Sequence, residues 1–76
     1  MLKRSDLPQI VLDTVKSLGG EATVVEVAKT IWAKHERDLR ASSDLFYTWQ
    51  YDMRWAAQSL RDRGLLTRSG KKWAAK

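Results

Sequence analysis

Apolar residues recur at helical spacing in three stretches of the chain. The first stretch follows Ser5 or Asp6, either of which can cap a helix, and has Pro8 in its first turn, where a missing N–H costs nothing. Its apolar face carries Leu7, Ile10, Val11, Thr14, Val15 and Leu18. Gly19 and Gly20 are then predicted to end this helix, because glycine readily adopts the left-handed conformation found beyond a helix C-terminus.

A capping box predicts the start of a second helix. The segment EAT (21–23) is short and extended, and Thr23 is followed three residues later by Glu26, the spacing at which each side chain bonds the other residue's backbone N–H. The buried side of this helix is predicted to carry Val24, Val27, Ala28, Ile31 and Trp32. We expect the helix to end near Lys34, and the polar stretch HERDLRASSD (35–44) to be a loop.

The third and longest helix is predicted from about Asp44 to Arg63. Ser42 or Ser43 is the expected cap, and Asp44 lies in the first turn, where the helix dipole favours an anion. The core stripe of this helix consists of Phe46, Trp49, Met53, Ala56, Ala57 and Leu60. Gly64 is expected to end the helix.

After Gly64 the apolar period changes and predicts a hairpin. LLTR (65–68) reads as a short strand, SG as a tight turn and KKWAA (71–75) as a returning strand, with Leu66 and Trp73 able to face the core. The segment EAT could add a third short strand. The predicted fold is therefore α+β and mainly helical: one winged helix-turn-helix domain over residues 1–76, with a recognition helix (about 44–63) and a wing (about 65–75).

Two segments of the chain resemble a known family. GGEATVVEVAKTIW and WQYDMRWAAQSLRDRGLLTRSGKKW are similar to the winged-helix domain at the N-terminus of Mrr-type restriction proteins. That family pairs a GG-x-A-T/S entry to its second helix with a third helix that reads R-x-x-W-A-x-x-x-L-x-x-x-G-L-L, followed by a hairpin that carries a Trp. Here Trp55-Ala56, Leu60 and Gly64-Leu65-Leu66 occupy those places, and Trp73 falls where the hairpin Trp is expected.

The resemblance extends from about Val11 to Trp73 and has one offset, because Arg54 directly precedes Trp55 instead of lying three residues before it. The nuclease domain that follows in Mrr-type proteins has no counterpart in these 76 residues. The resemblance therefore implies DNA binding without cleavage.

The charge of the chain is concentrated in its second half. The net charge is +5, and residues 1–38 hold six basic and six acidic side chains, whereas residues 39–76 hold eight basic and three acidic ones. A one-sided basic field attracts polyanions, of which nucleic acid is the first candidate and acidic lipid or protein the next. The same charge can also serve solubility alone.

The outer face of the predicted third helix is unusual in composition. Five of the seven aromatic residues of the chain lie between Phe46 and Trp55, which is too many for one buried stripe. The side opposite the core stripe, or flanking it, carries Tyr47, Thr48, Tyr51, Arg54, Trp55, Gln58 and Arg61. Exposed Tyr, Trp and Arg are typical of interfaces, although Tyr51 and Trp55 could instead pack beneath the wing or the N-terminal arm.

These residue types also suit DNA recognition. Arg can bind guanine O6 and N7 together, Gln can pair with adenine, and a Tyr hydroxyl can reach phosphates or bases. The turn of the predicted hairpin is basic, with Arg68, Lys71 and Lys72 around Ser69-Gly70, and could reach a neighbouring phosphate run; such lysines also protect an edge hairpin from aggregation. The predicted nucleic-acid-binding residues are Thr48, Tyr51, Arg54, Gln58, Arg61, Arg68, Lys71 and Lys72.

No pattern of catalytic or cofactor-binding residues stands out. The chain has no cysteine and one histidine, His35, so it offers no zinc pattern, and Gly19-Gly20 lacks the Lys-Ser/Thr of a phosphate loop. No apolar run reaches the ~18 residues of a membrane span, and the first residues lack the apolar region of a secretory signal. We expect a cytoplasmic protein that is no enzyme and has no cofactor, metal, small-molecule substrate or membrane partner.

The sequence thus favours a small double-stranded DNA-binding protein, such as a transcriptional regulator or a DNA-binding module. The alternative is a protein-interaction winged helix, whose aromatic third helix binds a partner or a second copy of the chain. The basic wing favours DNA, whereas Tyr51 and Trp55 favour protein.

Overall fold

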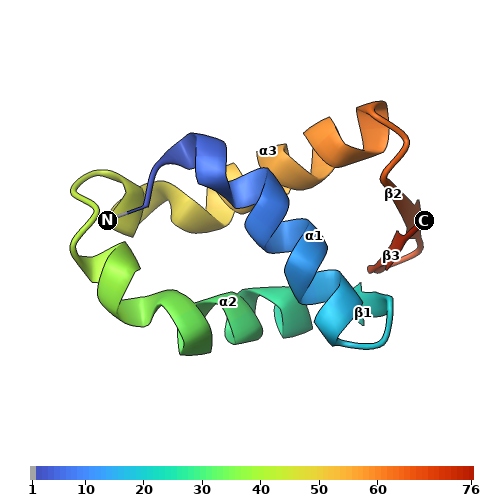
Figure 1. Ribbon diagram of the computed structural model, residues 1–76, viewed down its shortest axis with the longest axis horizontal. Helices are drawn as coiled ribbons and strands as arrows, with labels where there is room; N and C mark the ends of the chain where they lie inside the picture. Colours follow the sequence, from blue (N-terminus) through green and yellow to red (C-terminus); the bar gives the residue numbers. More distant parts are fainter. Residues whose placement is uncertain (1) are drawn as a thin grey trace.

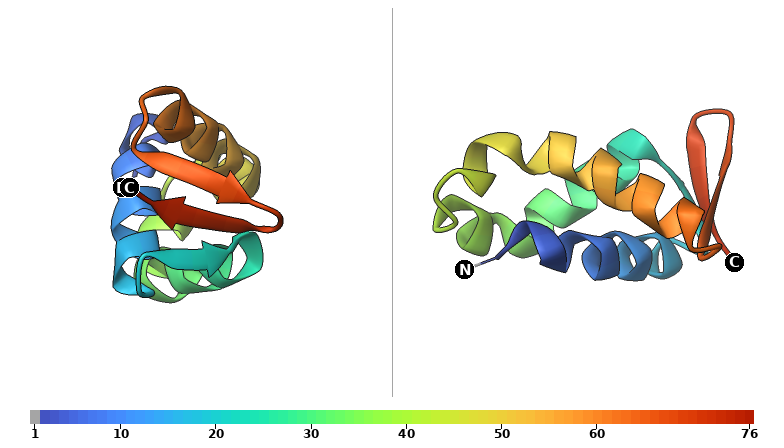
Figure 2. Two further views of the ribbon diagram at one scale, coloured as in Figure 1. Left: turned by 90° about the vertical axis from the view of Figure 1, so that its right-hand side faces the viewer. Right: turned by 90° about the horizontal axis from the view of Figure 1, so that it is seen from above.

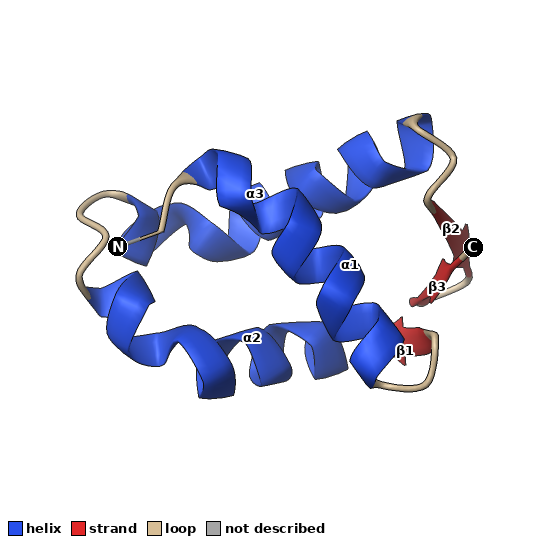
Figure 3. Ribbon diagram, viewed as in Figure 1, coloured by secondary structure: helices blue, strands red, loops and turns tan. Residues whose placement is uncertain are grey.

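Three helices and one small sheet make up the part of the chain that is described, residues 2–76 of a computed structural model. The elements in chain order are the 3-10 turn η1 (Arg4–Asp6), α1 (Leu7–Ser17), β1 (Glu21–Thr23), α2 (Val24–Arg40), α3 (Leu45–Asp62), β2 (Leu66–Ser69) and β3 (Lys72–Ala75). In Figure 1, α1 lies across α2 and α3, and the sheet closes the end of the molecule where α2 begins and α3 ends. The fold is α+β and mainly helical, as predicted, and Figure 3 shows how little of it is strand.

The sheet is antiparallel, with the strand order β1-β3-β2. The segment EAT does supply the third strand, and it pairs with β3 so that Ala22 lies opposite Trp73. Leu66, Trp73 and Ala22 are all buried, so the sheet turns one face onto the helices, as the sequence predicted for the hairpin residues. The β2–β3 hairpin projects past the helices in the right-hand view of Figure 2.

One apolar cluster holds the three helices and the sheet together. Its buried members are Leu7, Val11, Leu12, Val15, Ala22, Val27, Ile31, Leu39, Leu45, Trp49, Met53, Ala56, Ala57, Leu60, Leu66 and Trp73. The core stripe predicted for α3 is confirmed from Trp49 to Leu60, whereas Phe46 is only half-buried and Leu45 takes the buried place at the start of the helix.

The capping box of α2 is confirmed. Thr23 Oγ1 accepts a hydrogen bond from the Glu26 backbone N–H at 3.1 Å, and Glu26 Oε1 accepts one from the Thr23 N–H at 2.8 Å. The end of α1 is also as predicted, because both Gly19 and Gly20 have positive φ and the Gly20 N–H returns to the Val15 carbonyl. These local signals fix where α1 ends and where α2 begins.

The predicted end of the second helix was wrong. α2 continues for six residues beyond Lys34, to Arg40, so most of the stretch predicted as a loop is helical. The reason is Leu39, which lies two helical turns beyond Ile31 on the same side and is fully buried. Glu36 and Arg40 form an i,i+4 ion pair on the outside of this extension. Leu39 is the only apolar residue in 35–40, so this charged segment shows no apolar period from which a helix could be predicted.

The predicted serine caps of α3 were also wrong. Asp44 occupies the cap position with a helical backbone and makes no side-chain cap hydrogen bond. The Ser42 hydroxyl accepts instead from the Leu2 N–H at 2.9 Å and donates to the Asp38 carbonyl. Ser43 has a left-handed φ of 54°. A side-chain cap needs an extended backbone before the helix, and this tight turn does not provide one.

At the start of α1, the predicted capping hydrogen bond from the side chain of Ser5 or Asp6 is likewise absent. Ser5 lies inside η1, and Asp6 stands at the cap position of α1 without a side-chain cap hydrogen bond. The Asp6 carboxylate accepts from the Lys3 N–H at 2.9 Å, which closes the 3-10 turn that leads into the helix. Pro8 lies in the first turn, as expected.

Candidate nucleic-acid interface

A groove runs between the second half of α3 and the hairpin. It measures about 470 Å³ and is lined by Val24, Arg54, Ala57, Gln58, Arg61, Arg68 and Trp73. Four of these lining residues are among those predicted from sequence to bind nucleic acid: Arg54, Gln58, Arg61 and Arg68. The fold brings them together because β1 pairs with β3, one strand of the hairpin. This pairing holds the hairpin at the end of the molecule where α3 terminates (Figure 2).

The three arginines of this groove are exposed, and no carboxylate of residues 2–76 forms an ion pair with any of them. Arg61 Nη1 donates to Gln58 Oε1 at 3.1 Å, and Arg68 Nε donates to the Gly70 carbonyl at 3.1 Å. The Arg54 guanidinium makes no hydrogen bond within the described chain. The groove therefore presents three guanidinium groups whose charge is not neutralised locally, which is the arrangement that attracts an anion.

Gln58 is more constrained than its sequence position suggests. Its Nε2 donates to Asp62 Oδ1 at 2.9 Å while its Oε1 accepts from Arg61. Both ends of the amide are thus engaged within α3, and contact with a ligand would require the exchange of one of these bonds. Gln58 also holds the Arg61 guanidinium in place at the groove.

The two lysines of the hairpin turn differ in their surroundings. Lys72 Nζ lies 3.2 Å from Glu21 Oε1 across the β1–β3 pair, in an ion pair that is exposed on both sides. Lys71 has no carboxylate partner within residues 2–76 and lies beside Thr23, Val24 and Arg68. Of the two, Lys71 is the one whose charge stays available, since an exposed pair neutralises Lys72 locally.

Thr48 lies apart from the groove. Its hydroxyl donates to Asp52 Oδ2 at 2.8 Å, and Asp52 Oδ1 in turn pairs with Arg4 Nε at 3.2 Å. The Arg4 guanidinium also lies 4.1 Å from the centre of the Trp55 ring. The N-terminal segment therefore contacts this side of α3 through Arg4, and Thr48 belongs to that contact, but Trp55 stays 45% exposed beneath the guanidinium.

Two tyrosines form the most exposed apolar area of α3. Tyr51 is 76% exposed and Tyr47 is 82% exposed, whereas Trp55 beneath Arg4 is 45% exposed. Tyr47, Tyr51, Arg54 and Gln58 follow one another at steps of four, three and four, so they form one row along the helix. Tyr47 was not among the predicted binding residues, although the same spacing could have added it.

Other kinds of site find little support in residues 2–76. No three His, Asp or Glu side chains of this region lie together in a way that could hold a metal ion. His35 is half-buried in the middle of α2, far along the chain from any predicted binding residue. None of the described helices combines the length and apolar character that crossing a membrane requires.

Comparisons with known proteins add no family or relative. The chain matches no protein-family model, no curated protein and no solved structure. The likeness to Mrr-type winged helices is therefore an expectation from sequence alone.

Proposed function

We propose that this protein is a winged helix-turn-helix that binds double-stranded DNA. The observation that carries the proposal is the groove that Arg54, Arg61 and Arg68 line without a carboxylate partner in residues 2–76. Three helices followed by a hairpin, with the strand order β1-β3-β2, agree with this architecture: α3 would be the recognition helix and the hairpin the wing. A small cytoplasmic regulator or DNA-binding module fits such a surface.

In the proposed mode of binding, α3 enters the major groove with the row that contains Tyr47, Tyr51 and Arg54. Arg54 is the best candidate for a base contact, because its guanidinium is unpaired and a two-point grip on guanine discriminates by ~1–3 kcal/mol. Arg61 and Arg68 lie toward the end of α3 and on the hairpin, where phosphate contacts are the simpler role. Lys71 would extend these contacts along the backbone.

A salt titration tests the proposal. Duplex DNA of random sequence is bound by the wild type and by the variant Arg54→Ala/Arg61→Ala/Arg68→Ala over a range of salt concentrations. If each arginine neutralises one phosphate, the log–log slope of affinity against salt becomes shallower by about 2.7 in the variant, since each contact contributes about 0.9.

The control removes the same charge elsewhere. Lys16→Ala/Lys34→Ala/Arg37→Ala deletes three exposed cations of α1 and α2 that lie outside the groove. It should leave the slope close to that of the wild type. Equal losses in the two variants would show attraction by net charge alone, and an absence of duplex binding at low salt would favour a protein partner for the aromatic face of α3.

A further inference from the structure

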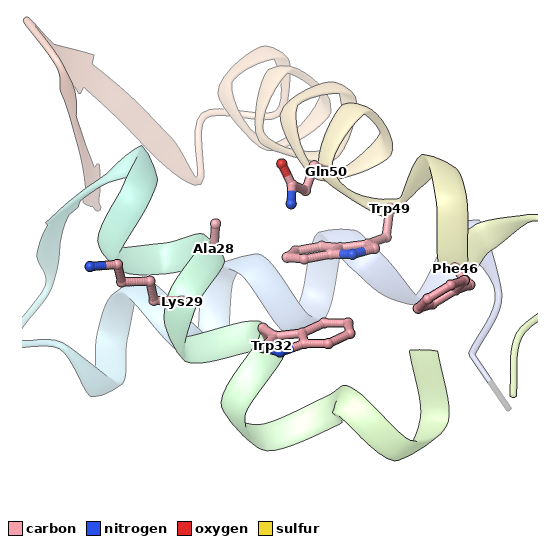
Figure 4. A pocket seen from close by; sticks show the side chains of 6 residues that line it. All are labelled: Ala28, Lys29, Trp32, Phe46, Trp49 and Gln50. Carbon is pink, nitrogen blue, oxygen red and sulfur yellow. The ribbon is translucent and has the colours of Figure 1, made fainter. Parts of the chain in front are cut away.

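A second hollow lies between α2 and α3, on the side away from α1 (Figure 4). It measures about 430 Å³ and is lined by Ala28, Lys29, Trp32, Phe46, Trp49 and Gln50. Trp32 of α2 and Trp49 of α3 stack with their ring centres 6.0 Å apart. The ring centre of Phe46 lies 6.4 Å from that of Trp32. The chain's own side chains thus build a hollow with aromatic walls and leave it open.

Among the described residues, one unpaired cation lies at the edge of this hollow. Lys29 belongs to the lining and has no carboxylate partner within residues 2–76. The Arg40 guanidinium lies 5.2 Å from the centre of the Trp32 ring and 5.8 Å from that of Phe46, although Glu36 pairs with it. No acidic residue lines the hollow. Its chemistry is therefore an apolar floor beside one unpaired cation and the amide of Gln50.

We propose that this hollow binds an acidic segment of a partner protein, which inserts one apolar side chain against Trp32 and Phe46 and places a carboxylate near Lys29. Aromatic walls favour burial of a large apolar side chain, and the cation favours an acidic neighbour to it. The occupant is thus identified by charge complementarity together with the apolar floor.

Two other occupants fit less well. A second copy of the chain carries a net charge of +5, so its approach to a cationic edge is unfavourable. Nucleic acid would meet one cation and three aromatic rings here, whereas the groove beside the hairpin offers three guanidinium groups. The two hollows share no lining residue, so this inference does not depend on the proposed DNA binding.

The test selects peptides from a displayed library of random sequences on the wild-type protein. The best peptides are then synthesised and titrated against three variants. Ala28→Leu fills the hollow, Lys29→Glu reverses the charge at its edge, and Lys34→Glu makes the same charge reversal on another side of α2. Indole N–H signals in NMR spectra report which tryptophans the peptide reaches.

We expect selected peptides to carry an aromatic or aliphatic residue flanked by Asp or Glu. Ala28→Leu should weaken their binding roughly tenfold to hundredfold, because one apolar side chain loses its burial. Lys29→Glu should weaken it more than Lys34→Glu does. The indole signals of Trp32 and Trp49 should shift while that of Trp73 stays in place.

Three results would overturn the inference: no enriched peptide, enriched peptides without acidic residues, or peptides that bind Ala28→Leu and Lys29→Glu as they bind the wild type. Thermal melts confirm that each variant is folded. If Ala28→Leu is destabilised, Lys29→Glu still tests the inference, because Lys29 is exposed and its substitution should not disturb the core. Duplex binding by Ala28→Leu should equal that of the wild type, which separates failure of this inference from failure of the DNA proposal.

Discussion

At the scale of single residues, the clearest electrostatic feature is the carboxylate of Glu26. The hydrogen bond from the Thr23 backbone N–H, followed by that with the Thr23 side chain, lowers the pKa of Glu26 below its ordinary value of 4.5. The charge also lies in the first turn of α2, where the helix dipole favours an anion. The ionised form is therefore the one that stabilises the start of α2.

The first prediction follows from the sign of this shift. Because the pKa is lower in the folded state than in the unfolded state, the stabilisation is present at neutral pH and is lost as the pH falls through the folded-state value. Glu26→Gln should therefore melt at a lower temperature than the wild type at pH 7, and the gap should shrink below pH 4.5. Thermal melts by circular dichroism over that range check this. A gap that stays constant with pH would show that the charge of Glu26 does not matter.

At the scale of elements, the length of α2 decides how the end of the molecule opposite the sheet is built. Its last six residues carry Leu39 into the core and place Arg40 over Trp32 and Phe46. The turn that follows is held by Ser42, which links the N-terminal segment to the end of α2. Without this extension, α2 would not reach the start of α3, and Arg40 would not lie over the rings of Trp32 and Phe46.

Truncation of the one apolar anchor in this extension gives the second prediction. Leu39→Ala should reduce the free energy of unfolding by about 2–5 kcal/mol, the range for large-to-small changes at fully buried sites. Urea unfolding measures this change. Leu65→Ala provides the control, because Leu65 is 40% exposed and should cost much less. If the two variants proved equally stable, residues 35–40 would not be docked on the core.

At the scale of the whole molecule, the fold concentrates the charge of the second half of the sequence. Arg54, Arg61 and Arg68 come from a helix and a strand, and the sheet brings them to one groove. Of the acidic residues of the same half, Asp52 pairs with Arg4, whereas Asp62 bonds the Gln58 amide beside the groove and forms no ion pair with its three arginines within residues 2–76. The surface beside the hairpin is therefore more basic than a net charge of +5 alone implies.

The third prediction separates base contacts from phosphate contacts across this surface. Arg54→Ala should reduce the discrimination between a selected site and scrambled DNA by roughly 1–3 kcal/mol. Lys71→Ala/Lys72→Ala should weaken binding to both duplexes alike. The log–log slope of affinity against salt should become shallower by about 1.8, or by about 0.9 if the ion pair with Glu21 already neutralises Lys72.

The measurement begins with selection of a preferred site from random duplexes, followed by titration of each variant on the preferred and scrambled sequences. If Arg54→Ala is folded and its discrimination is unchanged, Arg54 does not read a base. If both Arg54→Ala and Tyr51→Ala leave duplex binding intact, the exposed face of α3 serves a protein instead.

Local chemistry in the sequence determined most of the elements. The Thr23–Glu26 capping box, the Gly19–Gly20 stop and the apolar period of α3 each act within a few residues, so they could be recognised without a partner element. The same holds for the hairpin and for the basic character of its turn. The row of Tyr51, Arg54 and Gln58 also follows from helical spacing alone.

Tertiary structure decided what those residues meet. Burial of Leu39 in the core extends α2 beyond Lys34. The hydroxyl of Ser42 accepts a hydrogen bond from the Leu2 N–H and does not cap α3. The N-terminal segment places Arg4 over Trp55 and Asp52 on one side of α3. On the hairpin side, β1 pairs with β3, and Arg68 lines the same groove as Arg54 and Arg61. These contacts join residues far apart in the chain, and their stability depends on packing across elements, which no local period or propensity encodes.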